Sequence, residues 1–184
     1  MDLLHDALAG GDLVEFQRSV LDASTEVGAV VGIGKKWVLF QQLENWSRLT
    51  GYQAVRERDI ARVRRLKHSF SPRALALSGQ RPTAAAGVTL DRTKDVLRTG
   101  TERFRIVSVY TEYDEARMFY VGVARVGKKH AQLQTITTNG HWKRKPRPFR
   151  LGHISRIDFD GQYERALLAV LDAEAKAKKR SKSN

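Results

Sequence analysis

The segment 141–150 carries the residue types best suited to binding chemistry in this sequence. It reads HWKRKPRPFR, so Trp142 and Phe149 are interspersed with basic side chains. The basic residues are Lys143, Arg144, Lys145, Arg147 and Arg150. Cations contact phosphates and aromatic faces stack on bases, which is how single-stranded nucleic acid is bound. Two prolines exclude a helix and favour an extended, exposed loop. The alternative is that both aromatic rings point into a core while the basic residues are simply solvated.

A second basic run lies at 56–67. Its candidate binding residues are Arg56, Arg58, Arg62 and Arg64. Alternate residues of a strand share a face, so these arginines form two pairs, each on one side of its segment. We expect this run to extend the nucleic-acid surface, the alternative being a sheet edge that charge protects against aggregation. A basic stripe joining the two runs would favour nucleic acid, whereas a large contiguous apolar patch would favour a protein partner.

The net charge of the chain is +13. The segment 175–184 contributes five of these charges without an acidic residue, which leaves +8 (13 minus 5) for the rest. Its basic residues are Lys176, Lys178, Lys179, Arg180 and Lys182. A body this basic indicates a polyanionic partner. The alternatives are that the charge serves solubility alone and that the terminal segment is a solubilising tail.

The residues that catalysis or metal binding would need are not arranged for either purpose. The sequence has no cysteine, and its five histidines lack the spacing of metal ligands on a helix. The glycine-rich stretch 28–36 departs from the phosphate-loop pattern, whose first glycine would fall on Ala29 and whose Ser or Thr would fall on Lys36. We therefore predict no catalytic residue, no metal site, no cofactor and no enzymatic activity.

A hairpin that occurs twice positions these residues. The segments 26–43 and 119–136 overlay without a gap at an offset of 93 (127 minus 34). The identical positions include Gly34 with Gly127, Lys35 with Lys128, Lys36 with Lys129 and Gln41 with Gln134. Glycine accepts a positive φ angle and the lysines stay solvated, which is typical of a hairpin turn. Farther on, 59–63 matches 153–157 at an offset of 94 (154 minus 60), so we interpret the chain as a tandem duplication.

The expected fold class is α+β, mainly β, with two duplicated small bent β-barrels and peripheral helices. The expected divisions are 1–66 (helices and first barrel), 67–90 (linker with a short helix), 91–174 (helix, second barrel and final helix) and 175–184 (disordered basic tail).

Helix signals surround the predicted barrels. Apolar residues at helical spacing precede Gly10, and the capping pattern of Asp12 and Glu15 predicts a second helix before the first barrel. Start and stop residues predict further short helices at 72–78 and 91–98.

The second repeat differs from the first at its two ends. An extra strand is predicted at 103–110, ahead of the shared hairpin. Asp160 is predicted to cap a final helix whose apolar face ends near Ala175, where the chain should become a disordered tail.

The outline of a helix followed by a strongly bent sheet resembles the Sm-like and Src-homology-3-type small barrels. The resemblance covers 12–65 and 91–160. The Sm-like family binds single-stranded RNA through an asparagine-containing loop and a basic residue followed by glycine, and the segments 62–64 and 156–158 lack that glycine. The resemblance therefore assigns RNA contacts to no residue. As a whole, the chain looks like bacterial proteins of uncharacterised function built from two such repeats.

These observations define the expected partners. We predict a cytoplasmic protein without a signal peptide or membrane segment, because no apolar run approaches the ~20 residues of a membrane helix. The leading function is binding of RNA or single-stranded nucleic acid, since no recognition helix for a duplex is evident. The alternative is an adaptor that binds a protein in a groove between the two barrels. A third reading is a small-ligand pocket between the repeats.

Overall fold

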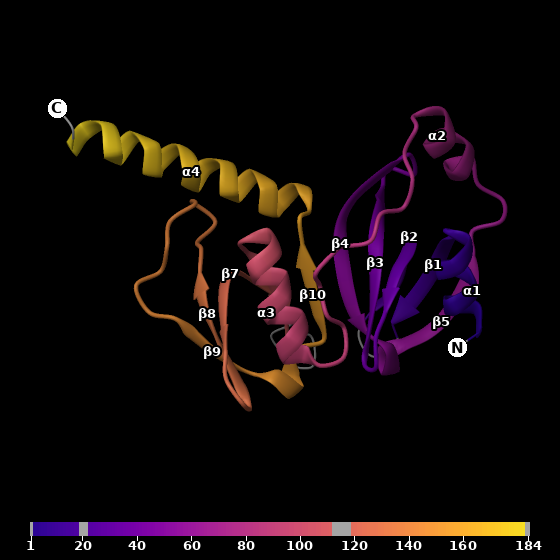
Figure 1. The fold of residues 1–184 in the computed structure, drawn as a ribbon, viewed down its shortest axis with the longest axis horizontal. Coiled ribbons are helices and arrows are strands. Elements are labelled where there is room, and N and C mark those ends of the chain that lie inside the picture. Colours follow the sequence, from indigo (N-terminus) through magenta and orange to yellow (C-terminus); the bar gives the residue numbers. More distant parts are fainter. Residues whose placement is uncertain (1, 19–21, 112–118, 183–184) are drawn as a thin grey trace.

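A single antiparallel β-sheet runs through the chain (Figure 1). The computed structural model describes residues 2–18, 22–111 and 119–182. Within them, ten strands pair in the order β5-β1-β2-β3-β4-β10-β6-β7-β8-β9. Four α-helices lie around this sheet in the described ranges, so the protein is mainly β with peripheral helices, as the sequence predicts.

The strands divide into two sets of five in chain order. The first set is β1 (Leu13–Arg18), β2 (Asp22–Ile33), β3 (Trp37–Glu44), β4 (Arg48–Arg56) and β5 (Ile60–Arg65). The second set is β6 (Val107–Tyr110), β7 (Phe119–Val126), β8 (His130–Thr135), β9 (Arg147–Arg150) and β10 (Arg156–Phe159). The helices are α1 (Asp2–Gly10), α2 (Ser71–Leu77), α3 (Thr93–Phe104) and α4 (Gln162–Lys182). Two short 3-10 turns are η1 (Glu57–Asp59) and η2 (Leu151–His153).

The two halves of the sheet have the same internal order. The first half reads β5-β1-β2-β3-β4 and the second reads β10-β6-β7-β8-β9. Each strand of the first half therefore has a counterpart in the second, and a 3-10 turn precedes the last strand of both halves. The strand predicted as an extra element at 103–110 is in fact β6, the counterpart of β1, and the helix α3 takes up its first two residues.

The repeated hairpin is present in both halves. The amide of Gly34 donates to the carbonyl of Trp37 at 2.9 Å, and the amide of Gly127 donates to His130 at 2.8 Å. The gapless overlay fails farther from the turn, because the pairing of β2 with β3 shifts between Val30 and Gly32. A β-bulge adds one residue to one strand only, so the offset before it becomes 94.

The bulge makes Gly28 the counterpart of Gly122. Gly28 pairs with Gln42 in the first half, and Gly122 pairs with Thr135 in the second. A Cβ atom added at Gly28 would lie 2.5 Å from the carbonyl oxygen of Gln41, and one at Gly122 would lie 2.0 Å from that of Gln134. Neighbouring backbones thus approach too closely for a side chain at both places.

Residues 13–18 form a strand and not the second helix predicted from Asp12 and Glu15. The strand β1 pairs with both β2 and β5, so its backbone groups are satisfied by partners distant in sequence. Its apolar side chains fit the sheet, since the ring of Phe16 stacks on Phe40 with centroids 3.9 Å apart. These long-range contacts override the local capping pattern, which is a weak determinant by comparison.

The strand pairing does not close either half into a barrel. Among the described residues, β5 and β9 are the outermost strands of one open sheet. The two halves meet where β4 pairs with β10 over four residue pairs, from Val55–Arg156 to Tyr52–Phe159. The separate barrels predicted from the sequence are therefore replaced by one continuous sheet. Edge strands leave unpaired backbone groups, and joining β4 to β10 satisfies two of those edges.

The strand β3 is buried on both faces and separates two cores. Trp37 and Leu39 pack in a cluster that extends to Ile157 and the helix α3. Val38 and Phe40 pack on the other face, with α1. Side chains alternate between the faces of a strand, so a strand covered on both sides is apolar along its whole length. This explains the unbroken apolar run WVLF at its start.

The helix α4 is longer than the sequence predicts. It continues to Lys182, so the stretch 175–182 is helical and not the disordered tail expected there. Alanine, lysine and arginine have high helix propensity and dominate this stretch, so the helix needs no apolar face to continue. Its first turns pack on the second half of the sheet through Leu167, and its last turns extend away from the body (Figure 1).

Candidate functional site

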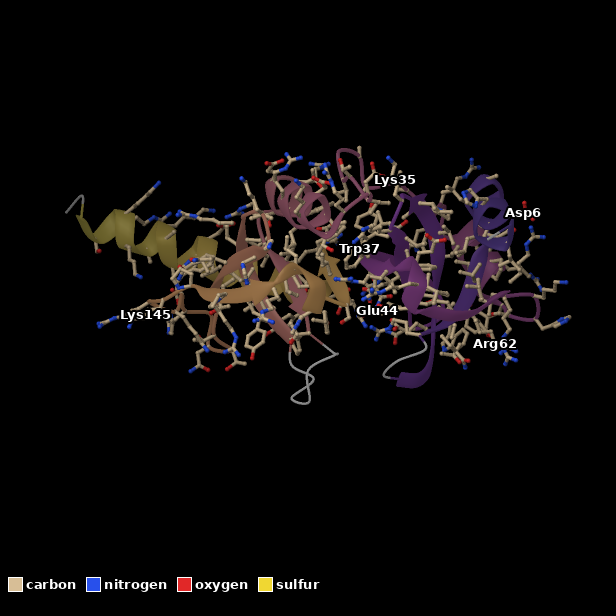
Figure 2. All side chains as sticks on the ribbon, turned by 90° about the horizontal axis from the view of Figure 1, so that it is seen from below. Asp6, Lys35, Trp37, Glu44, Arg62 and Lys145 are labelled. Carbon is tan, nitrogen blue, oxygen red and sulfur yellow. The ribbon has the colours of Figure 1, made fainter. Side chains whose placement is uncertain are left out.

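The strands that carry most of the two basic runs lie at opposite ends of the molecule. The segment 147–150 forms β9 and the segment 60–65 forms β5, the two outermost strands of the sheet. Figure 2 shows Lys145 and Arg62 near opposite ends of the longest dimension. The residues 143–145 and the β5 arginines therefore lie on separate surfaces, and Arg56 lies between them at the junction of the halves. Each run must be considered as a separate surface.

The loop between β8 and β9 holds an exposed tryptophan. The side chain of Trp142 is 45 % exposed, whereas Phe149 is buried. Trp142 forms a β-bridge with Ile136, and the amide of Lys143 donates to the carbonyl of Thr135 at 2.9 Å. The alternative that both aromatic rings point into the core holds for Phe149 and fails for Trp142. The backbone under Trp142 is thus fixed while its ring remains accessible.

The basic side chains of this loop follow Trp142 in the sequence and are exposed. Lys143, Arg144 and Lys145 are all exposed. The guanidinium of Arg147 lies 4.3 Å from the ring centroid of Tyr120, in the geometry of a cation–π contact. Arg150, at the end of β9, is also exposed. We call the residues 142–147 the basic loop.

The helix α4 lies directly against the start of this loop. His141 Nδ1 is 3.5 Å from Glu174 Oε1. A Cβ atom added at Gly140 would lie 2.9 Å from Val170 Cγ1, so the turn before the loop is packed on the helix. Lys178 lies one turn beyond Glu174, about 6 Å along the axis. The exposed basic residues of the helix end are Lys176, Lys178, Lys179 and Arg180.

This contact joins the start of the loop to α4, a relationship that sequence reasoning missed. The sequence interpretation treated 175–184 as a tail with no fixed relation to the loop. The signal that was present is the helix propensity of the Ala-, Lys- and Arg-rich stretch after Glu174. The contact between Gly140 and Val170 carries no sequence signature, because it depends on how the second half folds.

Two ion pairs and a cap fix the position of α4. Arg105 donates to both carboxylate oxygens of Asp172, at 2.9 and 2.7 Å, and this contact lowers the pKa of Asp172. Glu164 accepts a hydrogen bond from the amide of Gly161 at 3.0 Å at the start of the helix. Asp160, predicted as the helix cap, instead pairs with Arg165 at 2.9 Å.

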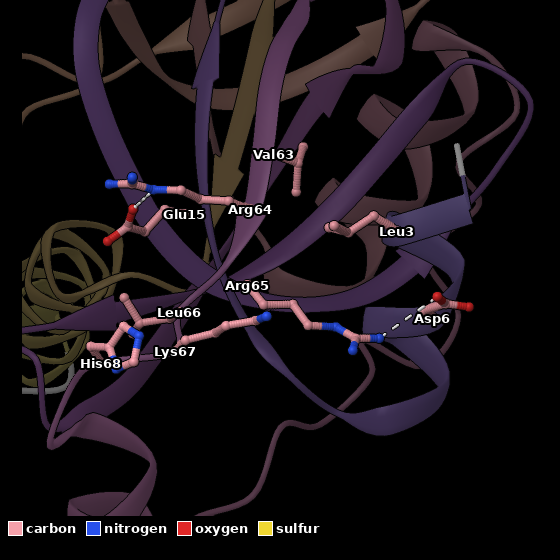
Figure 3. Close-up of a pocket in the computed structure, with 9 residues that line it drawn as sticks. All are labelled: Leu3, Asp6, Glu15, Val63, Arg64, Arg65, Leu66, Lys67 and His68. Carbon is pink, nitrogen blue, oxygen red and sulfur yellow. Dashed lines mark hydrogen bonds and ion pairs between the residues drawn. The ribbon is translucent and has the colours of Figure 1, made fainter.

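The second basic run is largely paired with acids. Figure 3 shows Arg64 bonded to Glu15, and Arg65 directed toward Asp6. Arg65 also lies 3.2 Å from Asp12. These residues surround a surface pocket of about 640 Å³ with Leu3, Val63 and Leu66 among its apolar residues. Arg58 contacts Asp59 at 3.5 Å, and Arg62 is exposed on β5.

Arg56, predicted as a binding residue, has a structural role. Its guanidinium donates to three carbonyl groups of the other half: Ile154 at 2.6 Å, Leu151 at 2.7 Å and Gly152 at 3.1 Å. It also lies 5.4 Å from the ring centroid of Trp37. The side chain therefore fastens the end of β4 to the turn η2, and it is not available to a ligand in this arrangement.

Arg156 is the counterpart of Arg62 and lies at the junction of the halves, with its side chain 15 % exposed. It pairs with Asp158 at 2.5 Å and Glu26 at 3.4 Å, and it lies over the ring of Tyr110. Burial raises the pKa of Asp158, while the adjacent Arg156 opposes that rise. Burial also raises the pKa of Tyr110. Equivalent positions of the repeats thus have different roles, one inside the junction and one on an open edge.

The region between the halves is occupied by the β4–β10 ladder. Beside it remains a shallow pocket of about 320 Å³ that Glu26, Gln53 and Gln162 help to line. This is the place where the sequence interpretation put a protein-binding groove or a small-ligand pocket. Among the residues that the structure describes, no three histidine, aspartate or glutamate side chains gather as metal ligands. None of the described helices combines the length and apolarity that crossing a bilayer requires.

The comparisons with known proteins add no relative to this geometry. No protein-family model, no curated protein and no solved structure matches the chain.

Proposed function

We propose that this protein binds RNA or single-stranded nucleic acid on the surface formed by the basic loop and the last turns of α4. The surface combines cations with an exposed aromatic ring, which are the two components of sequence-tolerant single-strand binding. The observation that carries the proposal is the position of Trp142. Its ring is exposed while its backbone is fixed in the sheet, and three basic residues follow it directly.

The helix end supports the proposal by extending the cationic surface. Glu174 contacts His141 at the start of the loop, so the basic residues after it continue from the loop. Phosphate contacts dominate the affinity of proteins for nucleic acid. The aromatic ring of the loop provides stacking on bases, and the lysines of the neighbouring helix provide phosphate contacts. Neither contact requires a recognition helix placed in the groove of a duplex.

We further propose that each five-stranded half is a Sm-like unit and that the two arose by duplication of one ancestral segment. The supporting observations are the identical strand order and the equivalent hairpin turns at Gly34 and Gly127. The 3-10 turn before the last strand of each half agrees with this. The proposed binding surface lies on the second unit only.

The test is a fluorescence anisotropy titration of a labelled single-stranded RNA of about 20 nucleotides at several salt concentrations. The variant combines Lys143→Ala, Arg144→Ala and Lys145→Ala. For single strands the slope of log affinity against log salt is about −0.7 per neutralised phosphate. Loss of three contacts should therefore make that slope shallower by about 2 and weaken binding at low salt.

A matched control removes charge elsewhere on the same half. Lys128 and Lys129 are exposed at the turn between β7 and β8, outside the proposed surface. The pair Lys128→Ala and Lys129→Ala should leave the slope unchanged to within about one unit. If the control and the loop variant weaken binding equally, the interaction follows net charge alone and the assigned surface is wrong. If the unmodified protein binds weakly and without salt dependence, phosphate-led binding is rejected.

A further inference from the structure

The junction between the halves shows how an extra strand is accepted by this fold. The amide of Glu57 donates to the carbonyl of Lys36 at 3.0 Å, which shows that the backbone groups of Glu57 point toward the β3 side of β4. Residues of an antiparallel strand alternate in the direction of their backbone groups. The groups of Ala54 and Tyr52 therefore point away from β3 and toward β10, where they pair with Ile157 and Phe159.

In the described part of the chain, the strand β5 presents the same kind of edge with no strand paired to it. It is the counterpart of β10 and pairs only with β1 among the described strands. The amide of Leu66 donates to the carbonyl of Leu13 at 2.9 Å, which sets the alternation along this ladder. The N–H and C=O groups of Val63 and Arg65 therefore point outward. These residues occupy the positions of Ile157 and Phe159 in the second half.

A second copy of the chain does not supply the missing strand. Among the described strands, the counterpart of β4 is β9. Pro148 on β9 stands where Ala54 stands on β4, and Pro146, just before β9, stands where Tyr52 stands. Proline has no N–H to donate, so both outward donors of the junction are missing. The side chains of β9 are also basic, as are those of β5, and like charges on facing strands repel.

The charges of the β5 edge select the chemistry of the occupant. The exposed side chains Arg62 and Arg64 lie on one face of the strand, and Lys67 follows it. The carboxylates of Asp6 and Glu15 lie in the adjoining pocket (Figure 3). This mixture disfavours the dense charge of a phosphate backbone, whereas an extended peptide pairs through its main chain and needs few charges. Leu3, Val63 and Leu66 offer apolar contact to its alternate side chains.

We infer that the outer edge of β5 binds an extended segment of a partner protein, rich in acidic and β-branched residues, as an eleventh antiparallel strand. Addition of a strand to an open sheet edge is an established mode of peptide recognition, in which the main chain supplies affinity and side chains supply specificity. This surface is separate from the basic loop, because it lies on the opposite outer strand.

The experiment uses the full chain and a labelled peptide of about seven residues in which valine and glutamate alternate. Binding is measured by fluorescence anisotropy. Two further peptides carry N-methyl groups on alternate residues, in one register or in the other. Because only alternate amides of a docked strand face β5, one methylated peptide should bind at least tenfold more weakly and the other should bind nearly as the parent does.

Hydrogen exchange gives a readout that needs no mutation. The amides of Val63 and Arg65 should exchange more slowly when the peptide is bound, while the amide of Arg64, which faces β1, should change little.

The variant Val63→Pro removes the outward donor as Pro148 does on β9, and should weaken binding about tenfold. The variant Lys128→Glu, at the exposed turn between β7 and β8 and outside both proposed surfaces, should leave peptide binding unchanged.

Three results would overturn the inference. One is no binding by any of the peptides. Another is binding that does not depend on the register of N-methylation, because the contact would then be one of charge alone. The third is displacement of the peptide from the β5 edge by single-stranded RNA with protection of the Val63 amide lost, because the edge would then belong to a polyanion.

Discussion

Pro148 on β9 lies at the position that Ala54 occupies on β4. Ala54 pairs with Ile157 of β10 across the junction, and Pro148 pairs with Gln132 of β8 while its nitrogen faces outward. The same position in the fold thus carries a backbone N–H donor in β4, inside the molecule, and a proline without that donor in β9, at its edge. Proline on an edge strand is one of the ways in which proteins prevent unwanted strand pairing.

Restoring the donors of β9 should therefore create an association between chains. We expect a variant with Pro146→Ala, Pro148→Ala, Lys145→Glu and Arg147→Glu to associate head to tail, with β9 of one chain on β5 of the next. The two proline changes alone should do so less, because the like charges remain. Sedimentation velocity over a range of concentrations measures this. A monomeric quadruple variant would show that the β4–β10 junction is not transferable to the free edges.

Arg56 and its counterpart Arg150 should differ sharply in their contribution to stability. Arg56→Ala removes donors to three carbonyl groups of the other half. The expected loss is about 2–3 kcal/mol in the free energy of unfolding. Arg150→Ala, at an exposed site, should change it by less than about 0.5 kcal/mol. Denaturant unfolding compares the two variants, and equal effects would contradict the role given to Arg56.

Gly28→Ala and Gly122→Ala should each destabilise the protein. The added Cβ would meet a backbone carbonyl at 2.5 Å in the first case and 2.0 Å in the second, so the strands must separate. The expected loss is about 1–3 kcal/mol for each variant. Gly152→Ala is the control, because nothing lies within 4 Å of its added Cβ. Thermal unfolding measures all three, and a neutral Gly122→Ala would contradict the close approach.

The ring of Trp142 should contribute to nucleic-acid affinity through stacking. Trp142→Ala should weaken binding of single-stranded RNA by about 1–3 kcal/mol, and Trp142→Phe should lose less because an aromatic face remains. Trp46, which is also about half exposed but lies in the first half, is the control: Trp46→Ala should leave the affinity unchanged. Equal affinity of the alanine and phenylalanine variants would exclude stacking at this position.

Alkaline pH should weaken the folded state through two buried phenols. Burial raises the pKa of Tyr52 and of Tyr110 above the ordinary tyrosine value of 10.0. A pKa that is higher in the folded chain gives stability that is complete below about pH 10 and is lost as the pH rises through the folded-state pKa. The free energy of unfolding should therefore fall above about pH 10.

Denaturant titrations between about pH 8 and 11 measure that fall. Tyr110→Phe should make it smaller, because the substituted side chain cannot ionise. Tyr163→Phe, at an exposed position, should leave it unchanged. An identical pH dependence in the unmodified protein and in Tyr110→Phe would refute the assignment.

The local parts of this fold are predictable from the sequence. The hairpin turns at Gly34 and Gly127 follow from the repeated Gly-Lys-Lys, because turn geometry is encoded by neighbouring residues. The helices near 72–78 and after Asp160 lie where the sequence predicts them, although Asp160 pairs with Arg165 and is not the cap of its helix. The internal repeat also gave the mainly β class. These features need no knowledge of distant contacts.

The long-range features are not predictable in the same way. The segment 13–18 carries a helix-capping pattern and becomes a strand, because its pairing with β2 and β5 outweighs local preference. The contact of β4 with β10 joins residues about 100 positions apart and has no local signature. The candidate site was affected for the same reason. Most of its predicted residues lie on or near the two opposite edge strands, whereas Arg56 lies at the junction of the halves, and only the order of the strands reveals this.

The distance in sequence between β4 and β10 has a consequence for the nascent chain. β4 ends at Arg56, and β10 begins at Arg156, 100 residues later (156 minus 56). A ribosome adding about 5–20 residues per second needs about 5–20 s to synthesise that stretch. Throughout this interval the amino-terminal half is already synthesised, but the outer edge of β4 has no partner strand. On a polysome, adjacent nascent chains would present the same unpaired strand edge. The rate of translation through the second half therefore governs how often β4 pairs with the β10 strand of its own chain.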